Sequence, residues 1–424
     1  MVKTRPSLSL PQVEQLYALL LSWGSGASSG HGWGMTSRVK PRCIVLQGAG
    51  GKAFCTGGDV RTAVTRSQAG EIEAVEGFFR IEYLLVFAIA NLHITSVALI
   101  DGLVMGGGVG VSIYASFRVA TERCVRAVKE AGLATHYISS KAIHLVGPAL
   151  AALGELASDH ITVHQTLCDL EALYPPPGHE VVLHSRPRPT ATVGSSLPVV
   201  QAKEINRASK LARRMNWIQH HFQHESMEAI VLSLQRAVTA SAVAAASAGY
   251  PAGADGTIKL HGLLQESSDF ASETLKVLSR SSPLSQKVTL SLMQRMQNAS
   301  LASCLDADWV LVDRFEHRQG DFFEGVRAML IDRTNDPKWK YATLEEIPKS
   351  VVDAFFTPGE GLTPLFGVGR GSALWGGGGC NTADESLAGM GVGEDGLGWD
   401  RVRSVLPVGE FSDSRALGGL FSKL

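Results

Sequence analysis

The sequence has few cysteines, few aromatic side chains and no excess charge of either sign. Its 424 residues include six cysteines, 7% aromatic residues and 39 Lys+Arg against 40 Asp+Glu, a formal net charge of -1. No two cysteines are spaced as CxxC, so we expect reduced thiols and neither a disulfide framework nor a zinc site. The balanced charge argues against a strongly basic nucleic-acid binder.

Long hydrophobic runs are also missing. The longest apolar stretch near the start, 16–23, is too short to span a bilayer, and the first ten residues lack the hydrophobic region of a secretory signal. Hydrophobic residues nevertheless make up 45% of the chain and charged residues 19%, which is ample for a buried core. We therefore expect a folded protein with no membrane partner.

Short apolar strands alternate with helical patterns in the first third of the chain, which favours an α/β core. Helices are expected at 11–23 and 71–90, and strands at 43–47, 96–100 and 117–120. The pattern from 141 to 170 is helical, 174–200 is rich in proline, and 203–350 is mainly helical. We expect four regions: an α/β core at 1–145, a helix and insertion at 146–202, a helical region at 203–350 and a disordered glycine-rich tail at 351–424.

Two glycine-rich turns follow two of the predicted strands. The first is Gly48–Asp59 (GAGGKAFCTGGD) and the second is Asp101–Gly110 (DGLVMGGGVG). Glycine permits close approach to the backbone, and two N–H groups aimed at one point stabilise a developing oxyanion. Glycine-rich turns are more often purely structural. Nucleotide-binding alternatives fail, because Lys52 is followed by Ala53 rather than Ser or Thr, and no ribose-binding acid follows the second turn.

The two turns together carry a specific resemblance. KAFCTGGD and DGLVMGGGVG, about fifty residues apart, resemble the enoyl-CoA hydratase/isomerase (crotonase) superfamily. FFRIEYLL, EAGLATH and DFFEGVRAMLIDRTNDPKWK resemble its 3-hydroxyisobutyryl-CoA hydrolase branch. The similarity covers residues 4–145 and 203–345, and the last motif is the most specific to the branch.

The resemblance implies a spiral of ββα turns that binds acyl-CoA without a metal or cofactor. It places the oxyanion donors on the backbone N–H groups of Thr56 and Gly107, and it puts Glu82 and Gly107 in the acyl pocket. Composition alone favours a solvated helix carboxylate for Glu82. Gly110 occupies the position of a catalytic glutamate in hydratases of the superfamily, which argues against hydration and fits the hydrolase branch.

One family segment is missing from the predicted core. The branch carries two functional carboxylates in a segment resembling MPE-T-xxG-xxPDVGG, whereas here VRAVK leads from Cys124 directly to Glu130. Glu130 aligns either with the missing glutamate or with the residue before Ala131; we prefer the second, because AGLATH follows without a gap. Hydrolysis of 3-hydroxyisobutyryl-CoA in valine breakdown is the first hypothesis, with Glu130 as a substitute carboxylate. A non-catalytic acyl-CoA-binding or ribosome-recruited protein is the alternative.

Four weaker features complete the predictions. His220, His221 and His224 offer two imidazoles at helical spacing, but no third ligand is apparent and exposed histidines are the simpler interpretation. His136 fits a strand or packing residue better than a base, and the basic residues at 203–214 fit a solvated helix face better than a phosphate site. The final Ser422, Lys423 and Leu424 predict a peroxisomal location, with the mitochondrion as alternative. The sequence is compatible with a homo-oligomer.

Overall fold

The computed structural model describes residues 2–4, 7–24, 41–124, 132–177, 210–247, 255–317, 320–359 and 361–366. These residues form two compact units. The first unit takes residues up to 58 and from 80 to 177, and the second takes 59–79 and 210–366. Each unit has its own core, and each is described by itself below.

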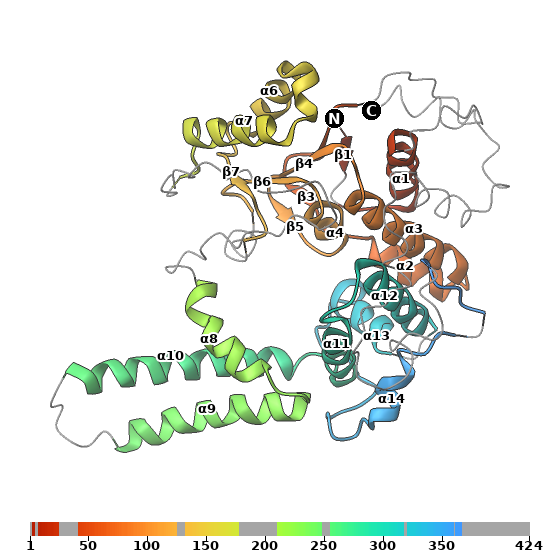
Figure 1. Cartoon of the computed structure of the whole chain (residues 1–424). Coiled ribbons are helices and arrows are strands. Elements are labelled where there is room, and N and C mark those ends of the chain that lie inside the picture. The colour runs from red at the N-terminus through yellow and green to blue at the C-terminus, as the bar shows by residue number, and fades with distance from the viewer. Residues whose placement is uncertain are drawn as a thin grey trace. The chain divides into compact units, whose positions relative to one another are not determined.

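The first unit is built on a five-stranded parallel sheet with the order β1-β2-β4-β6-β7 (Figure 1). The strands are β1 (Val2–Thr4), β2 (Cys43–Gly48), β4 (Thr95–Ile100), β6 (Phe117–Ala120) and β7 (His136–Tyr137). In the central pairs Val45 is opposite Val97, and Val97 is opposite Phe117. The predicted α/β class and the three predicted strands are therefore confirmed.

Helices cover both faces of this sheet, which is why β4 is buried at all six positions. One face carries Val97, Leu99 and Val119 against α6 (Val146–Ala152) and α7 (His160–Leu173), where Val163 and Leu167 are fully buried. The remaining helices of the unit are α1 (Leu10–Gly24), the second half of α3 (Ile72–Ala90) and α4 (Gly107–Ile113). The predicted helices at 11–23 and 71–90 are confirmed.

The region 141–170 is helical, as expected, but it is divided into several short elements. Between α6 and α7 lies the 3-10 segment η2 (Gly154–Ser158), and another, η1 (Ile143–Leu145), precedes α6. Gly154 has a φ of 56°, which ends α6, and the Asp159 side chain accepts the Thr162 N–H at 2.8 Å to begin α7. Local capping therefore overrides the alanine-rich pattern.

The second unit is helical, as predicted for 203–350. The disordered tail expected from 351 begins too early, because a helix runs to Ala354 and Phe355, Phe356 and Leu365 are buried. Its ordered elements are α2 (Val60–Gln68), the first half of α3, α8 (Lys210–Phe222), α9 (Met227–Ser247), α10 (Asp255–Leu278), α11 (Pro283–Met296), α12 (Leu301–Glu316), α13 (Phe322–Val326), the π-helical turn η3 (Arg327–Ile331) and α14 (Lys349–Ala354). Helices α9 and α10 lie side by side as a hairpin (Figure 1). Leu284 and Val288 of α11 are buried, which confirms the predicted apolar face.

The branch-specific motif at 321–340 has a structural role within this unit. Asp321 is buried and accepts the Ser282 hydroxyl at 2.5 Å and the Lys340 backbone N–H at 2.8 Å. Ser282 is in turn the N-cap of α11. Arg327 donates two hydrogen bonds to Glu324, each 2.7 Å long. The motif therefore ties the start of α11 to the segment that follows η3.

Replacing Asp321 by alanine should destabilise the second unit. Asp321→Ala leaves the Ser282 hydroxyl and the Lys340 N–H without this acceptor, so we expect a loss of about 2–4 kcal/mol in the free energy of unfolding. Urea denaturation followed by circular dichroism measures it. Asp336→Ala is the control, because its pair with Lys338 is exposed and should contribute under about 0.5 kcal/mol. Equal stability of both variants would contradict the structural role of Asp321.

Candidate active site

The two glycine-rich turns predicted from the sequence meet through their main chains. The short strands β3 (Ala53–Cys55) and β5 (Leu103–Val104) pair in parallel, and the Met105 N–H donates to the Cys55 carbonyl oxygen at 3.1 Å. The chain then turns at Gly57 on one side and at Gly106 on the other, with φ values of 91° and 53°. Glycine is required at both turns, because side chains rarely adopt these conformations.

The backbones also approach each other so closely that a side chain at Gly57 or at Gly108 would meet the opposite main chain. A Cβ on Gly57 would lie 3.1 Å from the Gly107 nitrogen, and a Cβ on Gly108 would lie only 2.1 Å from the Cys55 oxygen. These contacts bring the segment after β3 beside the first turn of α4. Two turns separated by about fifty residues therefore form one local structure.

Glu82 lies against this junction. It is only 6% exposed, and a Cβ built on Gly107 would lie 1.7 Å from its Oε1 atom. Burial raises the pKa of the Glu82 carboxyl from 4.5 to about 7. The interpretation of Glu82 as a solvated helix carboxylate is therefore wrong. Helix α3 therefore places the Glu82 carboxyl beside the glycine turn, where this group gains or loses its proton near neutral pH.

The predicted N–H donors occupy the two sides of the junction. Gly107 is the first residue of α4, so its N–H has no acceptor within the helix and lies at the positive end of the helix dipole. Thr56 is exposed and directly precedes Gly57, whose Cα lies against Gly106. Backbone donors with an adjacent carboxyl are suited to bind a carbonyl oxygen and to move a proton near it. Their assignment as an oxyanion hole remains a prediction.

Gly110 lies on α4, one turn beyond Gly107. A Cβ at this position would approach Val86 Cγ2 of α3 to 3.1 Å, so even alanine requires a shift of its neighbour. Gly110 contributes no acid or base, because it has no side chain. Of the four residues that the sequence placed at the site, Glu82 and Gly107 are in contact at the junction and Thr56 directly precedes Gly57, whereas Glu130 lies outside the described residues.

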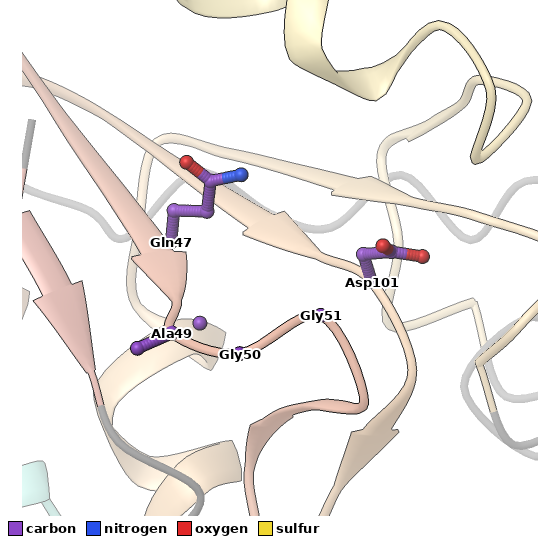
Figure 2. Close-up of a pocket in the computed structure, with 6 residues that line it drawn as sticks. Gln47, Ala49, Gly50, Gly51 and Asp101 are labelled. Atoms are coloured by element: carbon purple, nitrogen blue, oxygen red, sulfur yellow. The ribbon is translucent and has the colours of Figure 1, made fainter.

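A separate cavity of about 260 Å³ lies at the carboxyl ends of β2 and β4. It is lined by Gln47, Gly48, Ala49, Gly50, Gly51 and Asp101. Figure 2 shows the Gln47 and Asp101 side chains on the same side of the loop from Ala49 to Gly51. Asp101 accepts hydrogen bonds from Thr121 at 2.7 Å and Arg123 at 3.0 Å. Thr56, Glu82 and Gly107 do not line this cavity, which is therefore distinct from the glycine junction.

Several sequence predictions fall outside this site. Glu130 and the tail with Ser422, Lys423 and Leu424 lie outside the described residues. Of the basic segment at 203–214, the Arg214 side chain is described, and it pairs with Glu273 at 2.7 Å.

The histidines of α8 do not form a three-ligand cluster in the described part of the chain. His221 is buried and hydrogen-bonded to Ser233, whereas His220 is exposed. The sequence did not reveal a different group, His136, His164 and Cys168, because its members come from two elements and share no motif.

The sequence matches the model of the enoyl-CoA hydratase/isomerase family over residues 33–356. Similar proteins include the mitochondrial 3-hydroxyisobutyryl-CoA hydrolases of Rattus norvegicus and Gallus gallus, each 30% identical to this chain. The first comparison covers 82% of this chain and 83% of the relative, and the second covers 84% of each. The corresponding Homo sapiens protein is 29% identical, with 82% of each chain covered.

Solved structures support the fold. An enoyl-CoA hydratase from Rhodobacter sphaeroides superposes with a TM-score of 0.56 at 21% identity, over 84% of this chain and 94% of the other. A carnitinyl-CoA dehydratase from Mycobacterium thermoresistibile gives a TM-score of 0.54, also at 21% identity, over 84% and 91% of the two chains. Within the described residues, no helix is long and apolar enough to cross a membrane. Sequence and fold together show that this chain belongs to the enoyl-CoA hydratase/isomerase family.

Proposed function

We propose that this protein binds acyl-CoA thioesters and hydrolyses 3-hydroxyisobutyryl-CoA, a reaction of valine catabolism. The observation that carries the proposal is the contact between the buried Glu82 carboxyl and Gly107, beside the predicted backbone donors. The names of the relatives support the choice of thioester and of hydrolysis.

The proposed reaction uses Glu82 as a general base. Its carboxylate takes a proton from water while the water oxygen bonds to the thioester carbon. The carbonyl oxygen becomes an oxyanion that accepts hydrogen bonds from the N–H groups of Thr56 and Gly107. The tetrahedral intermediate then collapses with cleavage of the C–S bond, and the protonated Glu82 gives its proton to the departing CoA sulfur.

The test is thiol release from 3-hydroxyisobutyryl-CoA by the full chain. We expect release above the uncatalysed rate, with little change in Glu130→Ala because we align Glu130 with the residue before Ala131. Binding of the same thioester is measured in parallel by calorimetry. A large loss of rate in Glu130→Ala would instead identify Glu130 as the general base.

The non-catalytic alternative rests on the sequence between Cys124 and Glu130, where the segment that carries the two carboxylates of the hydrolase branch is expected to be missing. It predicts that the folded chain binds the acyl-CoA but releases no thiol. That outcome would overturn hydrolysis and leave an acyl-CoA-binding role, whereas the absence of both binding and release would favour the structural, ribosome-recruited alternative.

The cellular location is also a proposal. The relatives are named mitochondrial, which favours the mitochondrion, whereas the final tripeptide predicts the peroxisome. Neither location alters the chemistry proposed for Glu82.

A further inference from the structure

We propose that His136, His164 and Cys168 form a zinc site that joins strand β7 to helix α7. Their ligand atoms all lie within 4.8 Å of one another. His136 lies on β7, whereas His164 and Cys168 are four residues apart on α7 and therefore share one face of that helix. All three belong to the first unit and are separate from the glycine junction.

The distances approach those of a tetrahedral zinc ion. His136 Nε2 lies 3.0 Å from His164 Nδ1, and Cys168 Sγ lies 3.7 Å from His136 Nε2 and 3.9 Å from His164 Nδ1. With ordinary zinc bond lengths, two nitrogen ligands are separated by about 3.3 Å and a nitrogen and a sulfur by about 3.6 Å. Displacements of a few tenths of an ångström thus suffice to place one ion among the three atoms.

The surrounding hydrogen bonds orient the His136 ring for metal binding. The Thr135 hydroxyl accepts the Arg118 N–H at 2.8 Å and donates to the Arg118 carbonyl oxygen at 3.1 Å. The Thr135 hydroxyl also lies 2.9 Å from His136 Nδ1. Because its own proton is already donated to Arg118, it accepts a hydrogen bond from Nδ1, which therefore carries the proton of the ring. Nε2 then presents its lone pair to His164 and Cys168, which is the arrangement typical of a metal-ligating histidine.

Packing around the cluster limits the movement of both rings. The Phe117 ring stacks on His164 with centroids 6.0 Å apart and meets His136 edge to face at 5.7 Å. His136 is 1% exposed, whereas His164 and Cys168 are partly accessible, so an ion has a route from solvent. Two imidazoles and one thiolate are a donor set that zinc prefers, and they leave a fourth position for water.

The charge of the site is also compatible with a divalent cation. One thiolate reduces the charge of Zn²⁺ from +2 to +1. The three ligands come from β7 at the edge of the sheet and from α7, which packs against that strand. A structural clamp between the sheet edge and its covering helix is the role that follows from this placement.

Zinc binding by the full chain tests the proposal. The protein is stripped with a chelator and titrated with Zn²⁺ against a chromophoric competitor, and bound metal is measured by mass spectrometry. We expect one Zn²⁺ per chain and at least about a 100-fold weaker affinity in Cys168→Ser and in His164→Gln. His160→Gln is the matched control, because His160 contacts Phe117 one turn earlier on α7 but is not in the cluster.

Three further measurements keep the result decisive if a ligand variant is unstable. In the wild-type chain, Co²⁺ should give a thiolate-to-metal charge-transfer band. Zn²⁺ should protect Cys168 from alkylation, as mapped by peptide mass spectrometry. His220→Ala combined with His224→Ala should leave the stoichiometry unchanged. A wild-type chain that retains no Zn²⁺, or alkylation of Cys168 at the same rate with and without Zn²⁺, would overturn the proposal without affecting the hydrolase assignment.

Discussion

Replacing Glu82 by glutamine should lower the rate of thiol release by about 10²- to 10⁴-fold, the range usual for loss of a general base. Glutamine keeps the size of the side chain but cannot accept the proton from water. Binding of the acyl-CoA should change much less than the rate. The measurement is kcat and KM for 3-hydroxyisobutyryl-CoA in the wild type and in Glu82→Gln.

The pH dependence should identify the same group. Only ionised Glu82 acts as a base, so the wild-type rate should rise with pH through about 7, the pKa that burial produces. Residual activity of Glu82→Gln should lack this step. A wild-type profile flat between pH 5 and 8, or a variant with wild-type activity, would contradict the role of Glu82.

The same substitution should stabilise the folded protein at high pH. Because the folded-state pKa of Glu82 lies above the unfolded value of 4.5, the folded state binds more protons between pH 4.5 and 7, and its stability falls as pH rises through this window. The full penalty, about 3 kcal/mol, is present above pH 7. Glu82→Gln avoids it and should unfold at higher urea than the wild type at pH 8.

Glu73→Gln is the control for both measurements. Glu73 lies on the same helix, α3, but it is exposed. Its substitution should leave the rate, the pH profile and the stability at pH 8 unchanged. Equal stability gains in both variants would indicate a general charge effect instead of the burial of Glu82.

Gly108→Ala should impair folding, whereas Gly107→Ala should leave folding intact and lower the activity. At Gly108 the new Cβ meets the Cys55 carbonyl oxygen at 2.1 Å, and this backbone is fixed in β3. We expect Gly108→Ala to cost at least about 3 kcal/mol of stability or to prevent folding. At Gly107 the three atoms nearest to the Cβ all belong to side chains, Glu82 Oε1 at 1.7 Å, Glu82 Cδ at 3.0 Å and Leu8 Cδ1 at 3.5 Å, and none to the backbone.

Gly107→Ala should therefore fold and lose activity. Displacing the Glu82 carboxyl removes the base from the junction, so thiol release should fall about as far as in Glu82→Gln, by 10²- to 10⁴-fold. Urea denaturation and thiol release, measured on both glycine variants, separate the two effects. A folded, fully active Gly107→Ala would show that Glu82 does not need its present position.

Gly77→Ala is the control for alanine substitution. Gly77 lies within α3, and a Cβ there meets no atom within 4 Å. Replacing an unconstrained helical glycine by alanine should stabilise the protein by about 1 kcal/mol and leave activity unchanged. A destabilised Gly77→Ala would mean that the loss in Gly108→Ala does not report the contact with Cys55.

The sequence predicted those elements whose signals are local. Residues 43–46 and 97–100 are apolar over the length of a strand, and 71–90 is long enough to be a helix, so β2, β4 and α3 lie where expected. The glycine turns were found for the same reason, since a positive φ and a close backbone approach demand glycine. The two- and three-residue strands β1, β3 and β5 were missed, because so few residues carry no periodicity.

Only the tertiary structure determined the environment of the chemical groups. Glu82 looks like any helix carboxylate in the sequence, and its raised pKa arises because residues far along the chain bury it against Gly107. His136, His164 and Cys168 are likewise unremarkable in sequence and converge only because β7 pairs at the sheet edge under α7. The motifs that resemble the enoyl-CoA hydratase/isomerase superfamily thus predicted the fold family, whereas desolvation and long-range proximity set the environment of Glu82 and bring His136, His164 and Cys168 together.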